Sequence, residues 1–415
     1  MTVEEKDGER HADRAAAGQA AAMMAHLSGS SLAYPCGGRN TRSCCMIARF
    51  CSHLHILSNL CITILMTSPR NVGVLGASGY AGAELLRLLA RHPDLDIAWA
   101  AGDSSAGQPL AARYPGLRAA YGDLTFCSVD EGLEKGADVL FCALPHGRAA
   151  EIAPRALAAA GLVVDLSADF RLRDPSAYPA WYGAEHPFPD QLGAWPYGLP
   201  ELHREELRGA TRVAVPGCYP TAALLALAPL VAAGLAATDG IVVDAKSGLS
   251  GAGRSLTDGN LFVQANENVG AYKVGSHRHT PEIEQELALA AGAPVTVTFT
   301  PHLVPLSRGL LATCYATLAP SAGDEELAGC YAAAYGREPF VDVLSPGEGW
   351  PVTRAVATTN RVQVAAMADR RTGRVVAAAA IDNLVKGAAG QAVQCANLAL
   401  GLPETAGLDL VPPGP

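Results

Sequence analysis

The chain has 415 residues, of which 49% are hydrophobic and 17% charged, and its formal net charge is −9. This length predicts about two or three domains with sizeable cores, and the negative charge gives no electrostatic reason to expect nucleic acid or an anionic membrane as a partner. The 11 cysteines are odd in number and form no C-x-x-C pair, so neither a zinc site nor a disulfide framework is predicted. Reduced thiols are typical of a cytoplasmic protein.

The first 65 residues differ from the rest of the chain. They show no amphipathic period, and Arg49 and His53 interrupt the apolar run at 46–66, which makes a membrane-spanning helix costly. Early acidic residues argue against an organelle transit peptide, although arginines and serines leave that alternative open. We interpret residues 1–65 as a disordered or non-native extension, with Met66 as a plausible translation start before the first strand.

A short apolar strand at 72–75, a glycine-rich turn and a leucine-rich helix follow. Glycines three apart keep such a turn tight, let the backbone approach a pyrophosphate and let the helix lie close to the sheet. The spacing is G-x-x-G-x-x-G rather than G-x-G-x-x-G, and an ordinary strand-to-helix turn is the alternative. The position near a domain start favours dinucleotide binding, with these candidate residues: Gly76, Ser78, Gly79, Tyr80, Ala81 and Gly82.

Polar residues follow the next predicted strands, at 95–101, 138–144 and 163–166. Strand ends of this kind line the crevice where ligands of open α/β sheets bind. After the first of these strands, Asp103 suits the ribose diol of NAD, whereas Ser104 and Ser105 suit the 2′-phosphate of NADP, so the preference stays open here. The candidates after the other two strands are Pro145, His146, Ser167 and Arg171. We interpret His146 as a loop contact rather than a catalyst.

Cys218 occupies the start of a predicted helix. A β-branched run stops at Pro216 and Gly217, and Pro220 then opens an alanine- and leucine-rich stretch, because proline is favoured in a first helical turn. The positive end of a helix favours a thiolate and lowers the thiol pKa below its reference of about 8.5. The alternative is a small buried thiol, but the remainder of the chain favours a nucleophile.

Two histidines precede another predicted helix, with Thr280 as its N-cap and Pro281 as its first residue. Alternate residues of an extended segment point the same way, so His277 and His279 share a face. The sequence offers no further zinc ligands nearby, and an acid/base histidine paired with a thiolate is the better use.

A loop of small residues at 247–254 ends in Arg254, and Arg308 stands at the entrance of a later strand. Backbone N–H groups beside a fixed cation suit an anionic group. A flexible surface turn is the alternative for the loop.

The later strands alternate between apolar and polar residues at 295–299, 310–317, 362–367 and 375–381. This pattern predicts a mostly antiparallel sheet with one wetter face. The final helix, 383–399, is rich in small residues and can pack back on the first domain. The fold class is therefore α/β. A Rossmann-type dinucleotide-binding domain comprises 70–217 and 382–415, and an α+β substrate and dimerisation domain comprises 218–381.

From about residue 71 to 401 the chain resembles the N-acetyl-γ-glutamyl-phosphate reductases, relatives of aspartate-semialdehyde dehydrogenase. Eight motifs in order carry the resemblance: Gly76-Ala-Ser-Gly-Tyr-Ala-Gly82, Leu144-Pro-His-Gly147, Asp165-Leu-Ser-Ala-Asp-Phe-Arg171, Tyr197-Gly-Leu-Pro-Glu201, Pro216-Gly-Cys-Tyr-Pro-Thr221, Ser247-Gly-Leu-Ser-Gly-Ala-Gly-Arg254, His277-Arg-His-Thr-Pro-Glu282 and Asn383-Leu-Val-Lys-Gly-Ala-Ala-Gly390.

The resemblance implies a cytoplasmic homodimer or homotetramer that uses NADP(H) and an acyl phosphate substrate, without a metal. By the same resemblance Cys218 is the nucleophile, His277 is the acid/base, and the region of Asn383 helps the glycine turn to hold the cofactor. Expected substrate-binding residues are Arg171, Ser247, Arg254, Tyr272, His279 and Arg308. A thioester on the cysteine then precedes hydride reduction.

Three alternatives remain. An aminoadipyl-phosphate reductase of lysine biosynthesis and aspartate-semialdehyde dehydrogenase share the mechanism and differ in pocket length. A dinucleotide-sensing regulator belongs to another class, and it is opposed by Cys218, by the two histidines and by the absence of a basic stretch that faces DNA.

Overall fold

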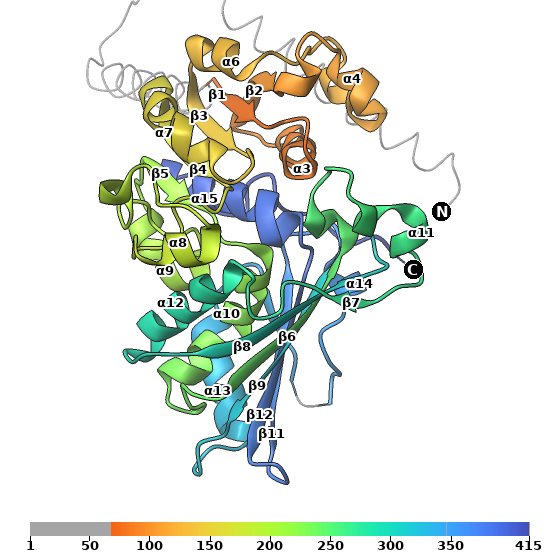
Figure 1. The fold of residues 1–415 in the computed structure, drawn as a ribbon. Coiled ribbons are helices and arrows are strands. Elements are labelled where there is room, and N and C mark those ends of the chain that lie inside the picture. The colour runs from red at the N-terminus through yellow and green to blue at the C-terminus, as the bar shows by residue number, and fades with distance from the viewer. Residues whose placement is uncertain (1–67, 346, 415) are drawn as a thin grey trace, which may run out of the picture. The chain divides into compact units, whose positions relative to one another are not determined.

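The computed structural model describes residues 68–345 and 347–414, which form two β-sheets with flanking helices (Figure 1). The N-terminal extension interpreted from the sequence lies outside the described residues. Among the residues that the structure describes, no helix combines the length and the apolar character needed to cross a membrane.

The first sheet has five parallel strands in the order β2-β1-β3-β4-β5 within the described residues. Its strands are β1 (Arg70–Leu75), β2 (Leu95–Ala101), β3 (Ala137–Cys142), β4 (Ala160–Asp165) and β5 (Arg212–Ala214). The order reverses at β1, because β2 lies on one side of it and β3 on the other. Ligands of open α/β sheets bind at such a reversal, beyond the carboxyl ends of the strands.

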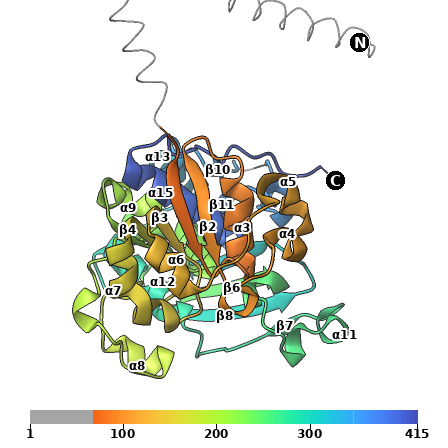
Figure 2. The ribbon, with the colours of Figure 1, turned by 90° about the horizontal axis from the view of Figure 1, so that it is seen from above.

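Helices cover both faces of this sheet (Figure 2). Apolar side chains of α3 (Tyr80–Leu89) and α15 (Gly390–Leu400) share one core with β1. Side chains of α6 (Val129–Lys135) and α7 (Arg148–Ala159) form a second core on the other face. Burial on both faces explains why these strands are continuously apolar in sequence.

The second sheet has seven strands in the order β10-β11-β12-β9-β6-β8-β7, counted over the described residues. The strands are β6 (Ile241–Gly248), β7 (Gly270–Ala271), β8 (Val297–Val304), β9 (Leu310–Thr317), β10 (Val341–Val343), β11 (Val362–Asp369) and β12 (Arg374–Ile381). The pairs β10/β11 and β6/β8 are parallel, and the other pairs are antiparallel. The predicted α/β class with a mostly antiparallel second sheet is confirmed.

Helix α10 (Cys218–Ala232) lies in the separate core that covers one face of the second sheet. Nearly every residue of this helix is buried, as is typical of a helix that is apolar all round. It packs with α12 (His279–Ala291) and α13 (Asp324–Tyr335) on one face of the second sheet (Figure 1). Short helices occupy the connections: α4 (Leu110–Arg113), α5 (Arg118–Tyr121), α8 (Ala177–Tyr182), α9 (Pro200–Leu207), α11 (Phe262–Ala265) and α14 (Thr353–Val356).

Three predicted helix boundaries differ from the structure. Helix α10 includes Cys218 as its first residue, two residues before the predicted Pro220. Helix α12 starts at His279 with Arg278 as its N-cap, so the prediction of a Thr280 cap is wrong. The final helix is preceded by a π-helical turn at Val385–Ala389, where Gly387 packs directly on Cys218.

Candidate active site

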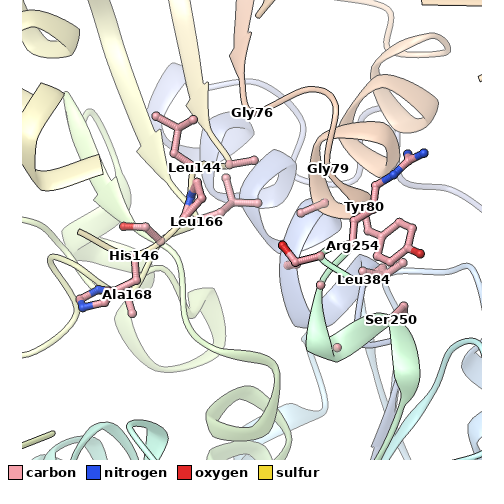
Figure 3. A pocket seen from close by; sticks show the side chains of 18 of the residues that line it. Gly76, Gly79, Tyr80, Leu144, His146, Leu166, Ala168, Ser250, Arg254 and Leu384 are labelled. Atoms are coloured by element: carbon pink, nitrogen blue, oxygen red, sulfur yellow. The ribbon is translucent and has the colours of Figure 1, made fainter. Parts of the chain in front are cut away.

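A cavity of about 1110 Å³ lies at the carboxyl ends of the first sheet, where the strand order reverses. Segments distant in sequence line it (Figure 3): the turn after β1, the ends of β3 and β4, the loop after β6, and the segment around Leu384. The predicted site residues that line it are Gly76, Ser78, Gly79, Tyr80, Ala81, Ser104, Pro145, His146, Ser167, Arg171, Cys218, Arg254, His279 and Asn383.

The glycine turn has the tight geometry that its spacing predicts. Gly76 has φ +72°, and a Cβ there would lie 2.3 Å from the carbonyl oxygen of Ala143, so only glycine fits. A Cβ on Gly82 would lie 2.4 Å from the carbonyl oxygen of Gly76. Gly82 therefore lets α3 lie close to the turn, and it does not itself line the cavity.

At the end of β2, the structure differs from the prediction for one candidate cofactor residue. Ser104 lines the cavity, but Ser105 is fully buried and does not, because the chain turns into a short 3₁₀ helix at Asp103–Ser105. The Oδ1 atom of Asp103 accepts a hydrogen bond from the backbone N–H of Val129 at 2.9 Å. The sequence analysis missed Arg113, which lines the cavity and donates from Nε to the carbonyl oxygen of Ser78 at 3.2 Å.

Nδ1 of His146 contacts the carboxylate of Asp169 beside the start of α7. Asp169 also accepts hydrogen bonds from the backbone N–H groups of Gly147 and Ala150. Burial opposes ionisation of Asp169, but these partners hold its pKa below the ordinary value. The contact holds the His146 loop in place, which supports its interpretation as a loop contact.

Cys218 lines the cavity from the first position of α10. This helix has no side-chain cap and no acidic residue in its first turn. Burial raises the pKa of the Cys218 thiol to about 11, although Arg171 opposes the shift. The predicted lowering of the pKa is therefore wrong for the free protein, because desolvation exceeds the effect of the helix end.

A buried network joins the nucleophile candidate to Arg171. Glu282 is fully buried, and its Oε1 accepts from the backbone N–H of Gly217 and from the hydroxyl of Tyr197, both at 2.8 Å. Its Oε2 lies 3.3 Å from Nη1 of Arg171. Nη2 of Arg171 donates to the carbonyl oxygen of Leu166 at 2.9 Å, while its buried Nε has no hydrogen-bond partner among the described residues. Such a donor suits an anionic ligand.

Sequence reasoning missed the role of Glu282 because an acid in a first helical turn is usually an exposed partner of the helix dipole. Its position one residue after Pro281, within the motif that contains both histidines, was the only available signal.

The two histidines lie together, with ring centroids 4.7 Å apart, as their shared face predicts. His279 lines the cavity, and a Cβ on Gly217 would lie 2.4 Å from its Nε2. His277 does not line the cavity, because its ring packs among Tyr219, Tyr272 and Phe299.

Hydrogen bonding and burial define the state of these rings. Nδ1 of His277 accepts from the backbone N–H of His279 at 3.1 Å, so in the neutral ring the proton sits on Nε2. Burial lowers the pKa of His277 to about 4, and it also lowers the pKa of His279 well below the ordinary value. Both rings are therefore neutral at neutral pH.

Three predicted substrate-binding residues do not line the cavity. The Oγ atom of Ser247 is buried and donates to the carbonyl oxygen of Gly248 at 3.2 Å. The hydroxyl of Tyr272 donates to that of Tyr219 at 3.3 Å. Arg308 is the largest correction, because its guanidinium is paired with Glu84 at 2.6 Å.

Arg254 and Asn383 lie where the glycine turn meets the loop after β6. The guanidinium of Arg254 is 6.0 Å from the ring centre of Tyr80 and 5.7 Å from that of Tyr114. It thus lies beside the predicted cofactor site. The side chain of Asn383 donates to Oγ of Ser250 at 2.9 Å, which joins two lining segments.

Two family models match the chain and give its class. The model described as "Semialdehyde dehydrogenase, NAD binding domain" matches residues 71–210, and "Semialdehyde dehydrogenase, dimerisation domain" matches residues 218–383. Solved structures show the same fold. Aspartate semialdehyde dehydrogenase II from Vibrio cholerae, complexed with ASA, has a TM-score of 0.62 and 19% identity and covers 81% of this chain and 99% of its own.

Another such enzyme, from Candida albicans with NADP, has a TM-score of 0.58 and 19% identity, covering 80% of this chain and 98% of its own.

Curated relatives identify the family within this class. N-acetyl-gamma-glutamyl-phosphate reductase from Symbiobacterium thermophilum is 52% identical over 338 residues, which is 81% of this chain and 97% of the relative. The enzyme of the same name from Acidothermus cellulolyticus is 53% identical over 342 residues, with the same coverage. The chain belongs to the N-acetyl-γ-glutamyl-phosphate reductase family and is an oxidoreductase. The resemblance found in the sequence is confirmed.

Proposed function

We propose that the chain reduces N-acetyl-L-glutamyl 5-phosphate to N-acetyl-L-glutamate 5-semialdehyde and phosphate with NADPH, a step of arginine biosynthesis. The observation that carries the proposal is the joining of a glycine turn and Cys218 in one cavity, in a chain about half identical to reductases of that name.

The proposed chemistry uses Cys218 as the nucleophile. Because thiol and imidazole are both neutral in the free protein, a histidine takes the thiol proton as Sγ attacks the acyl carbon and phosphate leaves. We assign this role to His277, with His279 as the rival that lines the cavity. The same imidazolium returns the proton to sulfur when the aldehyde departs.

Arg171 supports the charge that develops during this step. It is buried beside Gly217, where an added Cβ would lie 2.9 Å from Nη1, and its Nε donor is unpaired within the part of the chain that the structure describes. The uncapped N–H groups at the start of α10 face developing negative charge on the acyl oxygen. We assign Arg171 to the phosphate or to this oxygen.

The residues around the glycine turn fit a dinucleotide. Helix α3 has no side-chain cap and no acidic residue in its first turn, which leaves its N–H groups to phosphate oxygens. When bound, NADPH supplies the hydride that reduces the acyl group. Ser104, Ser167 and Asn383 are our further candidates for holding it, and Arg113 joins them.

The domain division and the assembly are also proposals. The packing of α15 in one core with β1 supports assigning 382–415 to the first domain. A matched dimerisation model supports a homodimer or homotetramer. The six cysteines within the described residues are free thiols, which supports a reducing compartment such as the cytoplasm.

The reverse reaction tests the proposed function. The full chain should reduce NADP⁺ with N-acetylglutamate semialdehyde only when inorganic phosphate is present. Parallel forward assays with the acyl phosphates of N-acetylglutamate, N-acetylaminoadipate and aspartate should favour the first. A preference for another acyl phosphate would reassign the substrate, and no activity with any of them would return the dinucleotide sensor to consideration.

A further inference from the structure

Charged side chains from separate parts of the fold meet beside helix α3. Glu84 is 3% exposed and accepts from Nη1 and Nη2 of Arg308 at 3.0 and 2.6 Å. Arg87 also donates to Glu84, at 2.9 and 2.7 Å, and the fully buried Asp382 lies 3.5 Å from Arg308. Two guanidinium groups thus balance two carboxylates, and removing one member leaves a charge unpaired.

Glu84 belongs to the cofactor side of this cluster. It lies one turn after Tyr80 in α3, the helix that begins at the glycine turn. Burial opposes its ionisation, but hydrogen bonds from Arg308 and Arg87 hold its pKa below the ordinary value. Glu84 is therefore an ionised residue of α3, and Gly79 and Tyr80 at the start of this helix line the cavity.

Arg308 lies on the other side of this charged cluster, in the loop between β8 and β9. Its loop binds the segment after β6 through the backbone, with Leu249 N–H donating to the carbonyl of Leu306 at 2.8 Å and Gly248 N–H to that of Gly309 at 2.9 Å. The N–H of Gly309 also donates to the side chain of Asn383 at 2.8 Å.

These hydrogen bonds join the Arg308 loop, the segment after β6 and Asn383, which together we call the Ser250–Asn383 unit. Two of its residues reach the cavity. Asn383 donates to Oγ of Ser250, and both residues line it. Figure 3 shows Ser250 and Arg254 next to Tyr80, while His146 lies at the far side. The Glu84–Arg308 contact is thus a direct side-chain link between the glycine-turn element and the Ser250–Asn383 unit.

We propose that Glu84 and Arg308 form a positioning pair that sets the spacing between the glycine turn and the Ser250–Asn383 unit. Neither residue lines the cavity, so the pair acts through these two walls, on a ligand long enough to touch both. This inference rests on NADPH as the proposed cofactor. Two parallel N–H···O bonds fix direction as well as distance, which a single-point lysine contact does not.

Comparing the binding of the whole cofactor with the binding of a fragment distinguishes a positioning role of the pair from a general effect on the stability of the protein. In this proposal NADPH would contact both walls, whereas adenosine 2′,5′-bisphosphate would occupy only the part near Ser104 and the glycine turn. We expect Arg308→Met to raise the Kd of NADPH about tenfold, measured by calorimetry without substrate, and to change the Kd of the fragment less than about twofold. Arg308→Lys should show the same contrast at a smaller size, and it serves if the methionine variant does not fold.

The matched control is Arg204→Met. Arg204 is also partly buried between two carboxylates, Glu338 and Glu404, but it does not line the cavity, and neither Kd should change. If Arg308→Met weakens both ligands equally, the pair only stabilises α3 and the inference is wrong. Unchanged NADPH binding would also overturn it. If the wild-type chain binds no NADPH, the proposed function fails and this inference fails with it.

Discussion

The two ends of the cavity are built in different ways. At the proposed cofactor end, the lining residues Gly76 and Ser78 to Ala81 come from one continuous turn. At the other end, Arg171, Cys218 and His279 come from distant parts of the chain, and Glu282 joins them from a fully buried position. The cofactor end is local and mostly backbone, whereas the thiol end is assembled from buried side chains.

This difference has an energetic consequence. A backbone turn keeps its N–H groups when a side chain other than that of a tightly packed glycine is replaced, so such substitutions remove little. Charges in a buried network interact at low dielectric, and each removal leaves a partner unsatisfied. Substitutions at the thiol end should therefore cost much more than those at the cofactor end.

The largest effect is expected for Cys218→Ser. Turnover should fall by at least about 10⁴-fold, because a serine hydroxyl is a far weaker nucleophile than a thiol in this setting. The Kd of NADPH should stay nearly unchanged, since the proposed function assigns the cofactor to the glycine turn. Steady-state assays and calorimetry measure the two quantities, and appreciable residual turnover would refute the covalent mechanism.

The next effect separates the two histidines. We expect His277→Asn to lower kcat by about 10²- to 10⁴-fold, the usual range for an acid/base group, without changing the Kd of NADPH. His279→Asn should act more on the KM for the acyl phosphate, because His279 lines the cavity beside Gly217.

The structure makes this a sharp comparison, since both rings are buried but only His279 lines the cavity. If the loss of kcat falls on His279→Asn instead, the two roles must be exchanged, and the role of Cys218 is unaffected.

A smaller loss is expected for Glu282→Gln, which keeps the shape of the side chain but removes its charge. The hydrogen bond to Gly217 weakens and Arg171 loses its counter-ion, so kcat should fall by about 10- to 100-fold, in line with hydrogen bonds to charged groups. Glu284→Gln is a matched control on the same helix, because Glu284 bonds only to the backbone N–H of Val297 among the described residues. Equal losses in both variants would indicate a general effect on α12.

The same contrast between local and assembled features explains what the sequence could predict. The parallel sheet, the glycine turn and the mostly antiparallel second sheet follow from apolar periodicity and glycine spacing over short stretches. Helix starts were less accurate at α10 and α12, because the residues just before each prolyl residue are already helical.

Features that depend on distant partners were missed. No residue near Arg308 in the sequence indicates its partner Glu84, which lies 224 residues away. The sequence alone therefore predicts a ligand contact for Arg308. The pKa of Cys218 was predicted from the helix end alone, whereas its direction is decided by burial among segments that meet only on folding.

The pH dependence of alkylation tests that burial. Because burial raises the pKa of Cys218 to about 11, its thiolate is lost as the pH falls below that value. The rate of alkylation by iodoacetamide should therefore rise about tenfold per pH unit between about 7 and 10, since the thiolate is the reactive form. The Cys218→Ser variant provides the background from other cysteines. A rate that levels off near neutral pH would show that the helix end outweighs burial.

The smallest effect is expected at the cofactor end, in the choice between NADPH and NADH. Asp103 is the residue that would favour NADH, but its Oδ1 is engaged by the N–H of Val129, and both Ser104 and Arg113 line the cavity. We expect higher kcat/KM with NADPH, and Ser104→Ala should reduce that preference about two- to tenfold, the range of one hydrogen bond. Ser105→Ala is the control, because Ser105 is buried away from the cavity and should leave the preference unchanged. Equal kcat/KM with the two cofactors in the wild-type chain would instead make Asp103 a ribose ligand.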